Sequence, residues 1–293
     1  MKKTISIIFS LVCLLAPNAS VMADGCKLTY KFTPGQQWLC NLNSKNESNY
    51  MGQKDVNQSR TVYAYAVSKG PKKGWVTLSA RIQSKGPETE GQMDLSQLRF
   101  TADVHTSGEI RNIQYTGSVM PDLGPAAAQM PPAMKKMMED SYKAIPEAYK
   151  HSVFWFPEVP EDKLEIGDEF DVQRKMAMAG GGGGAPGMTG MAGMGGMAME
   201  TVIHQVYILE DVSKGLAYFS VKDRSVTKVK GMQGGQSETK MAGKGDAIFD
   251  LEQGMWLEVT EKARAKVNLG GMAGMPAQDQ DMNMIFKYEM ERK

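Results

Sequence analysis

Short runs in which apolar and polar residues alternate cover most of the chain. Arg60–Val67 and Val76–Ile82 place apolar side chains at every second position, which is the pattern of half-buried antiparallel strands. Similar runs, rich in β-branched and aromatic residues and bounded by Gly, Pro, Asn or Ser, predict two sets of strands. The first set is Leu28–Phe32, Gln37–Leu42, Arg60–Val67, Trp75–Gln83, Leu98–Val104 and Glu109–Gln114. The second set is Glu169–Met176, Thr201–Leu209, Ala217–Val229, Lys240–Leu251, Met255–Ala265 and Met282–Glu291.

The stretch between the two sets has a helical period instead. Met134, Met138 and Tyr142 recur every four residues and would share one face of a helix. We expect an amphipathic helix here, interrupted at Pro146 because a proline inside a helix removes one backbone hydrogen bond.

The two sets of strands resemble each other in the order of their glycine-containing turns. The matching positions are Gly35 with Gly167, Gly74 with Gly215 and Gly108 with Gly254. We interpret this order as an internal duplication, and chance similarity among glycine-punctuated hairpins is the alternative.

The sequence therefore predicts a mainly β protein with two related antiparallel β units, curved sheets or half-barrels, joined by a helix-containing connector. A helix of this kind can cover the open apolar face of a curved sheet. The expected parts are a signal peptide at 1–23, a first β unit at 24–115, a helical connector at 116–165 and a second β unit at 166–293 with a Met/Gly-rich insertion at 180–199.

The first residues have the pattern of an export signal. Lys2 and Lys3 precede the apolar run Ile5–Leu15, and Val21-Met-Ala23 supplies the small-residue cleavage pattern. The apolar run is too short to cross a bilayer, and no later segment predicts a transmembrane helix. We expect an exported protein without a membrane span, in the periplasm or outside the cell.

Export would place Cys26 and Cys40 in an oxidising compartment. The segments Leu28–Phe32 and Gln37–Leu42 flank a turn and read as a hairpin, which would bring the two cysteines opposite each other. We expect a disulfide between them; a free thiol pair, redox-active or metal-binding, is the alternative.

Charge and motifs argue against several function classes. The formal net charge is +1, which gives no overall electrostatic footprint for nucleic acid. The chain contains no G-x-S-x-G, H-E-x-x-H or P-loop motif, and its three histidines, His105, His151 and His204, fall at no ligand spacing. We expect a protein that is not an enzyme and has no catalytic residues.

Three short motifs carry a family resemblance. They are Tyr30–Gly35 with the pattern YKF-x-x-G, Phe156–Pro160 with FP-x-x-P followed by Ile166–Phe170, and Gly245–Asp250 followed by Gly254. Together they resemble an uncharacterised family of exported bacterial proteins, often lipoproteins, over most of the mature chain.

The resemblance implies an exported β-rich protein and assigns no catalytic residue. The chain departs from the family pattern at Phe170, where tryptophan is usual, and by its Met/Gly-rich insertion. Its architecture also resembles periplasmic lipoprotein-carrier folds, whose curved sheet holds acyl chains. That likeness implies an apolar or envelope-derived ligand.

The insertion at 180–199 is the most unusual segment of a chain with 24 methionines. Thioether sulfur suits soft ions, so the segment is a candidate site for Cu(I) or Ag(I). The alternative is a low-complexity loop whose methionines bind nothing. The candidate ligands are Met188, Met191, Met194, Met197 and Met199.

The aromatic cluster Phe154, Trp155 and Phe156 has two interpretations. It packs the core between the two β units, or it forms the wall of an apolar ligand cleft. The leading hypothesis is an exported, non-enzymatic binding or interaction protein without a cofactor, whose partner is an apolar ligand or an envelope protein. The alternative is a Met-rich copper- or silver-binding protein.

Overall fold

The computed structural model describes residues 25–50, 53–84, 95–119, 130–178, 198–230, 236–268 and 279–293 of the chain. In these ranges the chain is mainly β, as predicted, and its strands form one 11-stranded sheet. In chain order the elements are β1 (Gln37–Tyr50), β2 (Gln53–Lys69), β3 (Trp75–Ser84), β4 (Arg99–His105), β5 (Ile110–Thr116), α2 (Pro132–Val153), β6 (Glu169–Met178), β7 (Ala198–Ser213), β8 (Leu216–Lys230), β9 (Gln236–Asp250), β10 (Met255–Asn268) and β11 (Asp279–Arg292).

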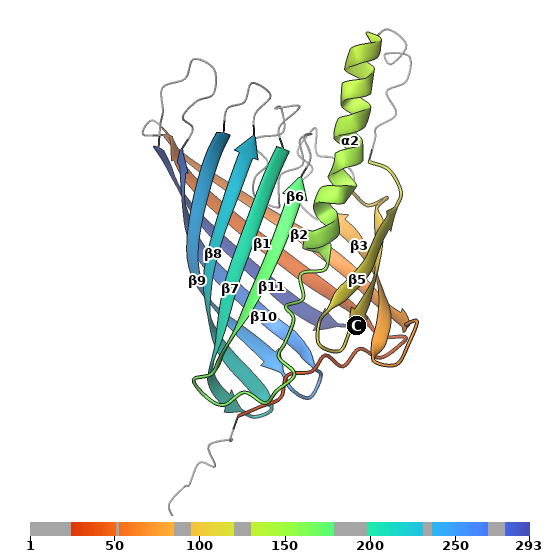
Figure 1. Cartoon of the computed structure of the whole chain (residues 1–293), viewed down its shortest axis with the longest axis vertical. Helices are drawn as coiled ribbons and strands as arrows, with labels where there is room; N and C mark the ends of the chain where they lie inside the picture. The colour runs from red at the N-terminus through yellow and green to blue at the C-terminus, as the bar shows by residue number, and fades with distance from the viewer. Residues whose placement is uncertain are drawn as a thin grey trace, which may run out of the picture.

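The strand order across the sheet is β5-β4-β3-β2-β1-β11-β10-β9-β8-β7-β6, and the described pairings are all antiparallel. Two meanders, β1–β5 and β6–β10, therefore lie on either side of β11. Figure 1 shows the sheet curling round until its edge strands β5 and β6 face each other, with α2 and the segment that follows it between these edges.

The prediction of two separate β units joined by a helical connector was wrong. Strand β11 pairs with β1 along one edge and with β10 along the other, so both meanders belong to one continuous sheet. The physical reason is that β11 has no counterpart in the first set of strands. The backbone groups on its two edges find hydrogen-bond partners in one strand from each meander, and this joins the meanders into one sheet.

The two meanders nevertheless begin and turn in the same way. The amide of Gly35 donates to the carbonyl of Val67 over 2.9 Å, and the amide of Gly167 donates to the carbonyl of Leu209 over 2.8 Å. The turn glycines matched in the sequence have left-handed φ angles in both meanders: Gly35 92° and Gly167 96°, Gly74 80° and Gly215 78°, Gly108 89° and Gly254 65°. The duplication itself stays a prediction.

The segment from residue 25 to residue 36 crosses one end of the curled sheet and is not a strand. The amide of Tyr30 donates to the carbonyl of Thr106 over 2.8 Å, and the amide of Lys31 donates to the carbonyl of Gly254 over 3.1 Å. The expected hairpin of Leu28–Phe32 with the following strand was therefore wrong, because β2 and β11 already occupy both edges of β1.

The expected disulfide was wrong for the same reason. Cys26 forms an isolated antiparallel bridge with Leu164, whereas Cys40 lies within β1 between Tyr63 and Met290. Both cysteines are free and buried. Without the hairpin, nothing in the register of the sheet brings the two sulfur atoms together.

Helix α2 begins at Pro132, directly after Pro131, a position where the missing amide of proline costs little. It continues through Pro146, where the sequence predicted an interruption. Pro146 is buried, and packing of its ring helps to offset the hydrogen bond that it cannot donate. The helix contacts both edge strands, β5 and β6.

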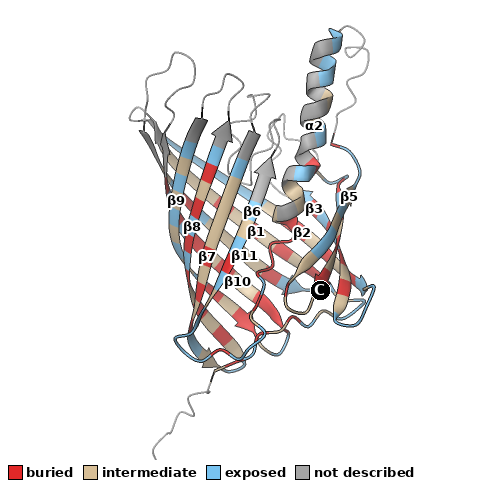
Figure 2. Ribbon diagram, in the orientation of Figure 1, coloured by how far each residue is buried: buried red, intermediate tan, exposed pale blue. Residues whose placement is uncertain are grey.

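An aromatic core fills the end of the curled sheet that the 25–36 segment crosses. The indole of Trp256 donates to the Tyr30 hydroxyl over 2.8 Å, and that hydroxyl donates to the carbonyl of Pro157 over 2.9 Å. Tyr30 also packs edge-on against Phe156 and Phe249. Figure 2 shows that buried positions gather toward this end. Toward the other end, polar side chains such as Ser225 and Thr227 join apolar ones such as Ala265 and Met284 on the inward face.

Candidate functional site

The inner face of the curled sheet encloses a cavity of about 490 Å³. A volume of this size falls within the range of about 300–1,000 Å³ that small-molecule sites occupy. Side chains of β1, of the run β5–β11 and of the 152–158 segment line it. Residues from both faces of β6, such as Asp171 and Val172, contribute to the lining, so the cavity reaches the edge of the sheet beside α2.

The three aromatic residues singled out in the sequence form one wall of this cavity. Phe154, Trp155 and Phe156 are 3%, 5% and 4% exposed, and all three line it. Tyr65 holds their segment in place by donating its hydroxyl hydrogen to the carbonyl of Val153 over 2.5 Å. The Trp155 ring lies 4.7 Å from the ring of Tyr288 on β11. The cluster therefore packs into the core and faces the cavity as well.

The cavity is also lined by a group of polar side chains from four strands, three of them buried and one, Arg174, partly exposed. Arg174 of β6, Gln205 of β7, Asp223 of β8 and Glu261 of β10 all line the cavity. The amide of Gln205 donates to the carboxyl group of Glu261. Asp223 is 2% exposed and Glu261 is 8% exposed. Carboxyl groups buried this deeply are rare and usually need a charged or hydrogen-bonding partner.

Burial changes the protonation of the two acids. The pKa of Glu261 is raised to about 8, mainly by burial and also by the neighbouring Asp223, while Arg174 lowers it. Burial also raises the pKa of Asp223 to about 6, against the hydrogen bond from the backbone of Arg224. At neutral pH Glu261 is therefore mostly protonated and Asp223 is mostly ionised.

Two atoms of this group lack a hydrogen-bond partner in the described part of the protein. They are Nη2 of Arg174, a donor, and Oδ1 of Asp223, an acceptor, and both are buried. A buried polar atom without a partner costs about 1–3 kcal/mol. The indole Nε1 of Trp155, another cavity residue, is a further buried donor without a partner, so the described lining offers two donors and one acceptor to a molecule that enters it.

Sequence reasoning missed these four polar residues. Asp223 follows Phe219 and Val221 at alternate positions of β8, and its own strand neighbours on that face are Ser225 and Thr227. The inward face of this strand thus changes from apolar to polar part of the way along. That change was the available signal, and the predictions from the sequence did not use it.

The proposed copper ligands Met188, Met191, Met194 and Met197 lie outside the described residues. Met199 lies near the start of β7, opposite Met178 of β6. Met241 and Met284, from β9 and β11, do line the cavity. Copper or silver binding by the Met/Gly-rich segment stays a prediction.

The histidines take ordinary structural positions where their side chains are described. His105 Nδ1 lies 2.9 Å from the hydroxyl oxygen of Ser107, and His204 Nε2 lies 3.1 Å from a carboxylate oxygen of Asp171. Within the described ranges, no three His, Cys, Asp or Glu side chains gather as a metal-ion site. In the same part of the chain, no helix has the length and apolar character needed to cross a membrane.

No protein-family model matches the chain, and no curated protein matches its sequence. Among solved structures, the chain is similar to Ail, the attachment invasion locus protein of Yersinia pestis, with 5% identity over 89% of this chain and 100% of that chain at a TM-score of 0.23. It is also similar to the β domain of the Bordetella autotransporter BrkA, with 6% identity over 88% of this chain and 99% of that chain at a TM-score of 0.35. A loop-deletion form of OmpT, an outer membrane protein of Vibrio cholerae, has 5% identity over 87% of this chain and 98% of that chain at a TM-score of 0.26.

Proposed function

We propose that this protein is a non-enzymatic binding protein that holds an amphiphilic ligand inside the curled sheet. The observation that carries the proposal is the cavity itself, where an aromatic wall faces a buried donor and acceptor, Arg174 Nη2 and Asp223 Oδ1, that have no described protein partner. An apolar wall with a small number of placed polar groups is the usual character of a small-molecule site.

The two sides of the cavity define the ligand class. Phe154, Trp155 and Phe156 offer apolar contact to an acyl or other hydrocarbon portion. Arg174 supplies a donor to an acceptor oxygen of a carboxylate, ester or phosphate, and Asp223 accepts from a hydroxyl or ammonium group. A lipid or lipid-like molecule that carries both kinds of polar group fits this arrangement best.

The proposal includes an exported location, as the N-terminal pattern of Lys2, Lys3 and Ile5–Leu15 predicts. The polarity of the sheet agrees with a protein whose outer face meets water. Inward positions of β8 and β9 such as Phe219 and Phe249 are buried, whereas outward positions such as Lys222 are exposed.

Binding of a fluorescent fatty acid, cis-parinaric acid, tests the proposal. Ala265 is a buried cavity residue of β10, and Ala242 is an exposed residue on the outward face of β9, so tryptophan at each position gives a matched pair. We expect Ala265→Trp to weaken binding by about tenfold or more, a loss of about 1.4 kcal/mol, and Ala242→Trp to leave it unchanged.

Thr227→Phe, also at a cavity position, provides a second occluding variant if Ala265→Trp does not fold. Circular dichroism spectra and thermal melting curves establish the fold of each variant before the titrations are compared. Equal affinity of the wild-type protein and of a folded, occluded variant would show that the probe binds elsewhere, and the proposal would fail.

A further inference from the structure

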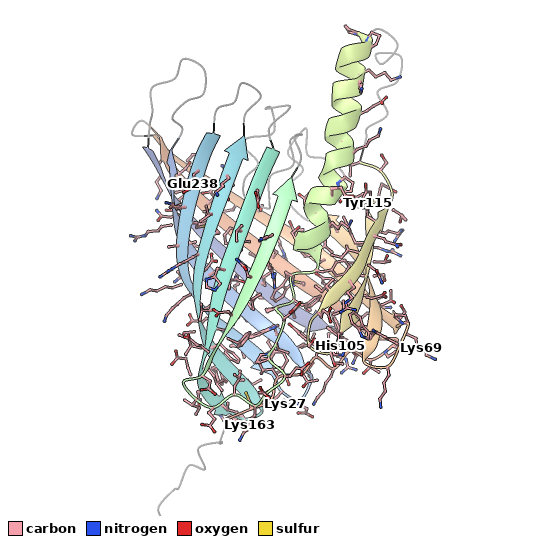
Figure 3. All side chains as sticks on the ribbon, in the orientation of Figure 1. Lys27, Lys69, His105, Tyr115, Lys163 and Glu238 are labelled. Atoms are coloured by element: carbon pink, nitrogen blue, oxygen red, sulfur yellow. The ribbon has the colours of Figure 1, made fainter. Side chains whose placement is uncertain are left out.

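The outward face of β8, β9 and β10 carries a concentration of basic side chains. We call it the basic face, and it comprises seven exposed residues: Lys222, Arg224 and Lys228 of β8, Lys240 and Lys244 of β9, and Lys262 and Arg264 of β10. Figure 3 shows side chains projecting outward on this side of the sheet, where Glu238 is labelled.

The register of the sheet places like charges directly beside one another. Lys222 pairs with Lys244, and Lys244 pairs with Lys262, so three ammonium groups lie in one row across three strands. The next row places Arg224 and Arg264 on either side of Ala242. Like charges at directly opposed positions destabilise a sheet, so this row does not serve the fold.

Acidic groups neutralise the basic face only at its margin, where Lys228 lies between Glu200 of β7 and Glu238 of β9 in the register of the sheet. Lys240 pairs with Glu238 over 3.1 Å. For Lys222, Lys244 and Lys262, no ion pair occurs with any acidic residue that the structure describes. Among the other acidic residues of these strands, Asp246 and Glu258 share the outward face, whereas Asp223 and Glu261 point to the other side of the sheet, into the cavity.

We propose that the basic face docks on the phosphate-bearing surface of an anionic lipid bilayer. Strands in a sheet lie about 4.8 Å apart and alternate residues on one strand about 7 Å apart, so the charges form a broad array rather than a pocket for a single anion. Clusters of four to eight Lys and Arg residues are typical of surfaces that bind anionic lipids.

Two further observations favour a bilayer over a nucleic acid. Positions 222–226, 240–244 and 262–264 on the outward face hold no aromatic side chain, whereas proteins that bind single-stranded nucleic acid interleave basic and aromatic residues. The inward side chains of the same three strands, among them Asp223 and Glu261, line the ligand cavity. Docking through this face would hold the cavity one sheet thickness from a source of amphiphiles.

Vesicle co-sedimentation tests the proposal without reference to the cavity. The full chain is mixed with vesicles of phosphatidylcholine, with or without phosphatidylglycerol. We expect binding only to the anionic vesicles and its loss at high salt, because the attraction between exposed charges is screened. Lys222→Glu combined with Lys244→Glu should lower the bound fraction by about tenfold or more.

The control is Lys69→Glu combined with Lys73→Glu, which makes the same charge change on exposed lysines outside the basic face and should leave binding intact. Replacement of Lys222, Lys244 and Lys262 by Gln is the second variant if charge reversal disturbs folding. All variants should bind cis-parinaric acid like the wild-type protein, so that failure of docking and failure of the cavity proposal can be told apart. Equal vesicle binding by the basic-face and control variants, no binding to anionic vesicles, or tighter binding to single-stranded DNA than to the vesicles would each overturn the proposal.

Discussion

Glu261 is the residue whose chemistry depends most on its surroundings. It lies on the inward face of β10, accepts a hydrogen bond from Gln205, and shares the cavity with the acid Asp223 and the cation Arg174. Its pKa is raised to about 8, so it can hold a proton at neutral pH and act as a neutral hydrogen-bonding group. No local sequence motif around Glu261 predicts this role. Its side chain points inward only because alternate residues of β10 face the cavity.

This arrangement makes the stability of the fold depend on pH. The pKa values of Glu261 and Asp223 are raised from 4.5 to about 8 and from 3.8 to about 6, so the folded state holds both protons more tightly than the unfolded chain does. Their contribution to stability is therefore fully present below about pH 4 and is lost as the pH rises through about 6 and then about 8. We expect Glu261→Gln to reduce this loss and to be more stable than the wild-type protein at about pH 9, by up to a few kcal/mol.

Urea denaturation between about pH 5 and pH 9 measures this effect. Glu258→Gln is the matched control, because Glu258 lies on the same strand, faces outward and pairs with Lys287 over 3.2 Å. A Glu261→Gln variant whose pH profile is parallel to that of the wild-type protein would contradict the assignment of Glu261 as a protonated buried acid.

At the scale of the elements, the sequence predicted most of the strands correctly. Each predicted strand except Leu28–Phe32 corresponds to a strand of the sheet. The predicted strands were too short where the inward face is polar. Strand β1 continues past Leu42, and β2 begins before Arg60. The added parts contain residues such as Ser44 and Ser59, whose hydroxyl oxygens lie 2.7 Å apart. Without apolar alternation, that part of the strands looks like a loop.

The turn glycines give a prediction at this scale. Gly215 and Gly254 both have left-handed φ angles, so alanine at either position is strained by about 1–2 kcal/mol. A side-chain carbon at Gly254 would also lie 2.6 Å from the amide nitrogen of Lys31 and 2.6 Å from the carbonyl oxygen of Thr29, whereas nothing lies within 4 Å of one at Gly215. Gly254→Ala should therefore destabilise the protein more than Gly215→Ala, because the 25–36 segment must move away from the sheet.

The comparison is made by urea denaturation of the two variants under the same conditions. We expect Gly215→Ala to cost about 1 kcal/mol and Gly254→Ala at least about twice as much. Equal losses would mean that the crossing segment contributes little to the stability of this end of the sheet.

At the scale of the whole molecule, the sequence could not show how the two sets of strands combine. Pairing of β1 with β11 joins residues more than two hundred positions apart, such as Trp38 and Arg292, and no local pattern encodes that choice. The distribution of charge could not be predicted from the sequence either. The net charge is +1, but basic residues concentrate on the outward face of β8–β10 while Asp223 and Glu261 face inward. Both properties follow from the strand order and its register.

A single continuous sheet has a consequence for unfolding. Since β11 hydrogen-bonds to β1 and to β10, neither meander can lose its structure without leaving one edge of β11 unpaired. We expect one cooperative transition, with far-ultraviolet circular dichroism and tryptophan fluorescence changing together. Two separated transitions would indicate that the meanders are independent units.

The proposed function depends on occupation of the cavity, and native mass spectrometry of the protein purified from its own cells tests this most directly. We expect a mass increment that dissociates as an amphiphilic organic molecule. The wild-type protein and Ala242→Trp should carry it, and Ala265→Trp, whose new side chain would fill the cavity, should lack it. A wild-type protein that carries no organic ligand, or an increment that persists in a folded Ala265→Trp variant, would contradict the proposed function.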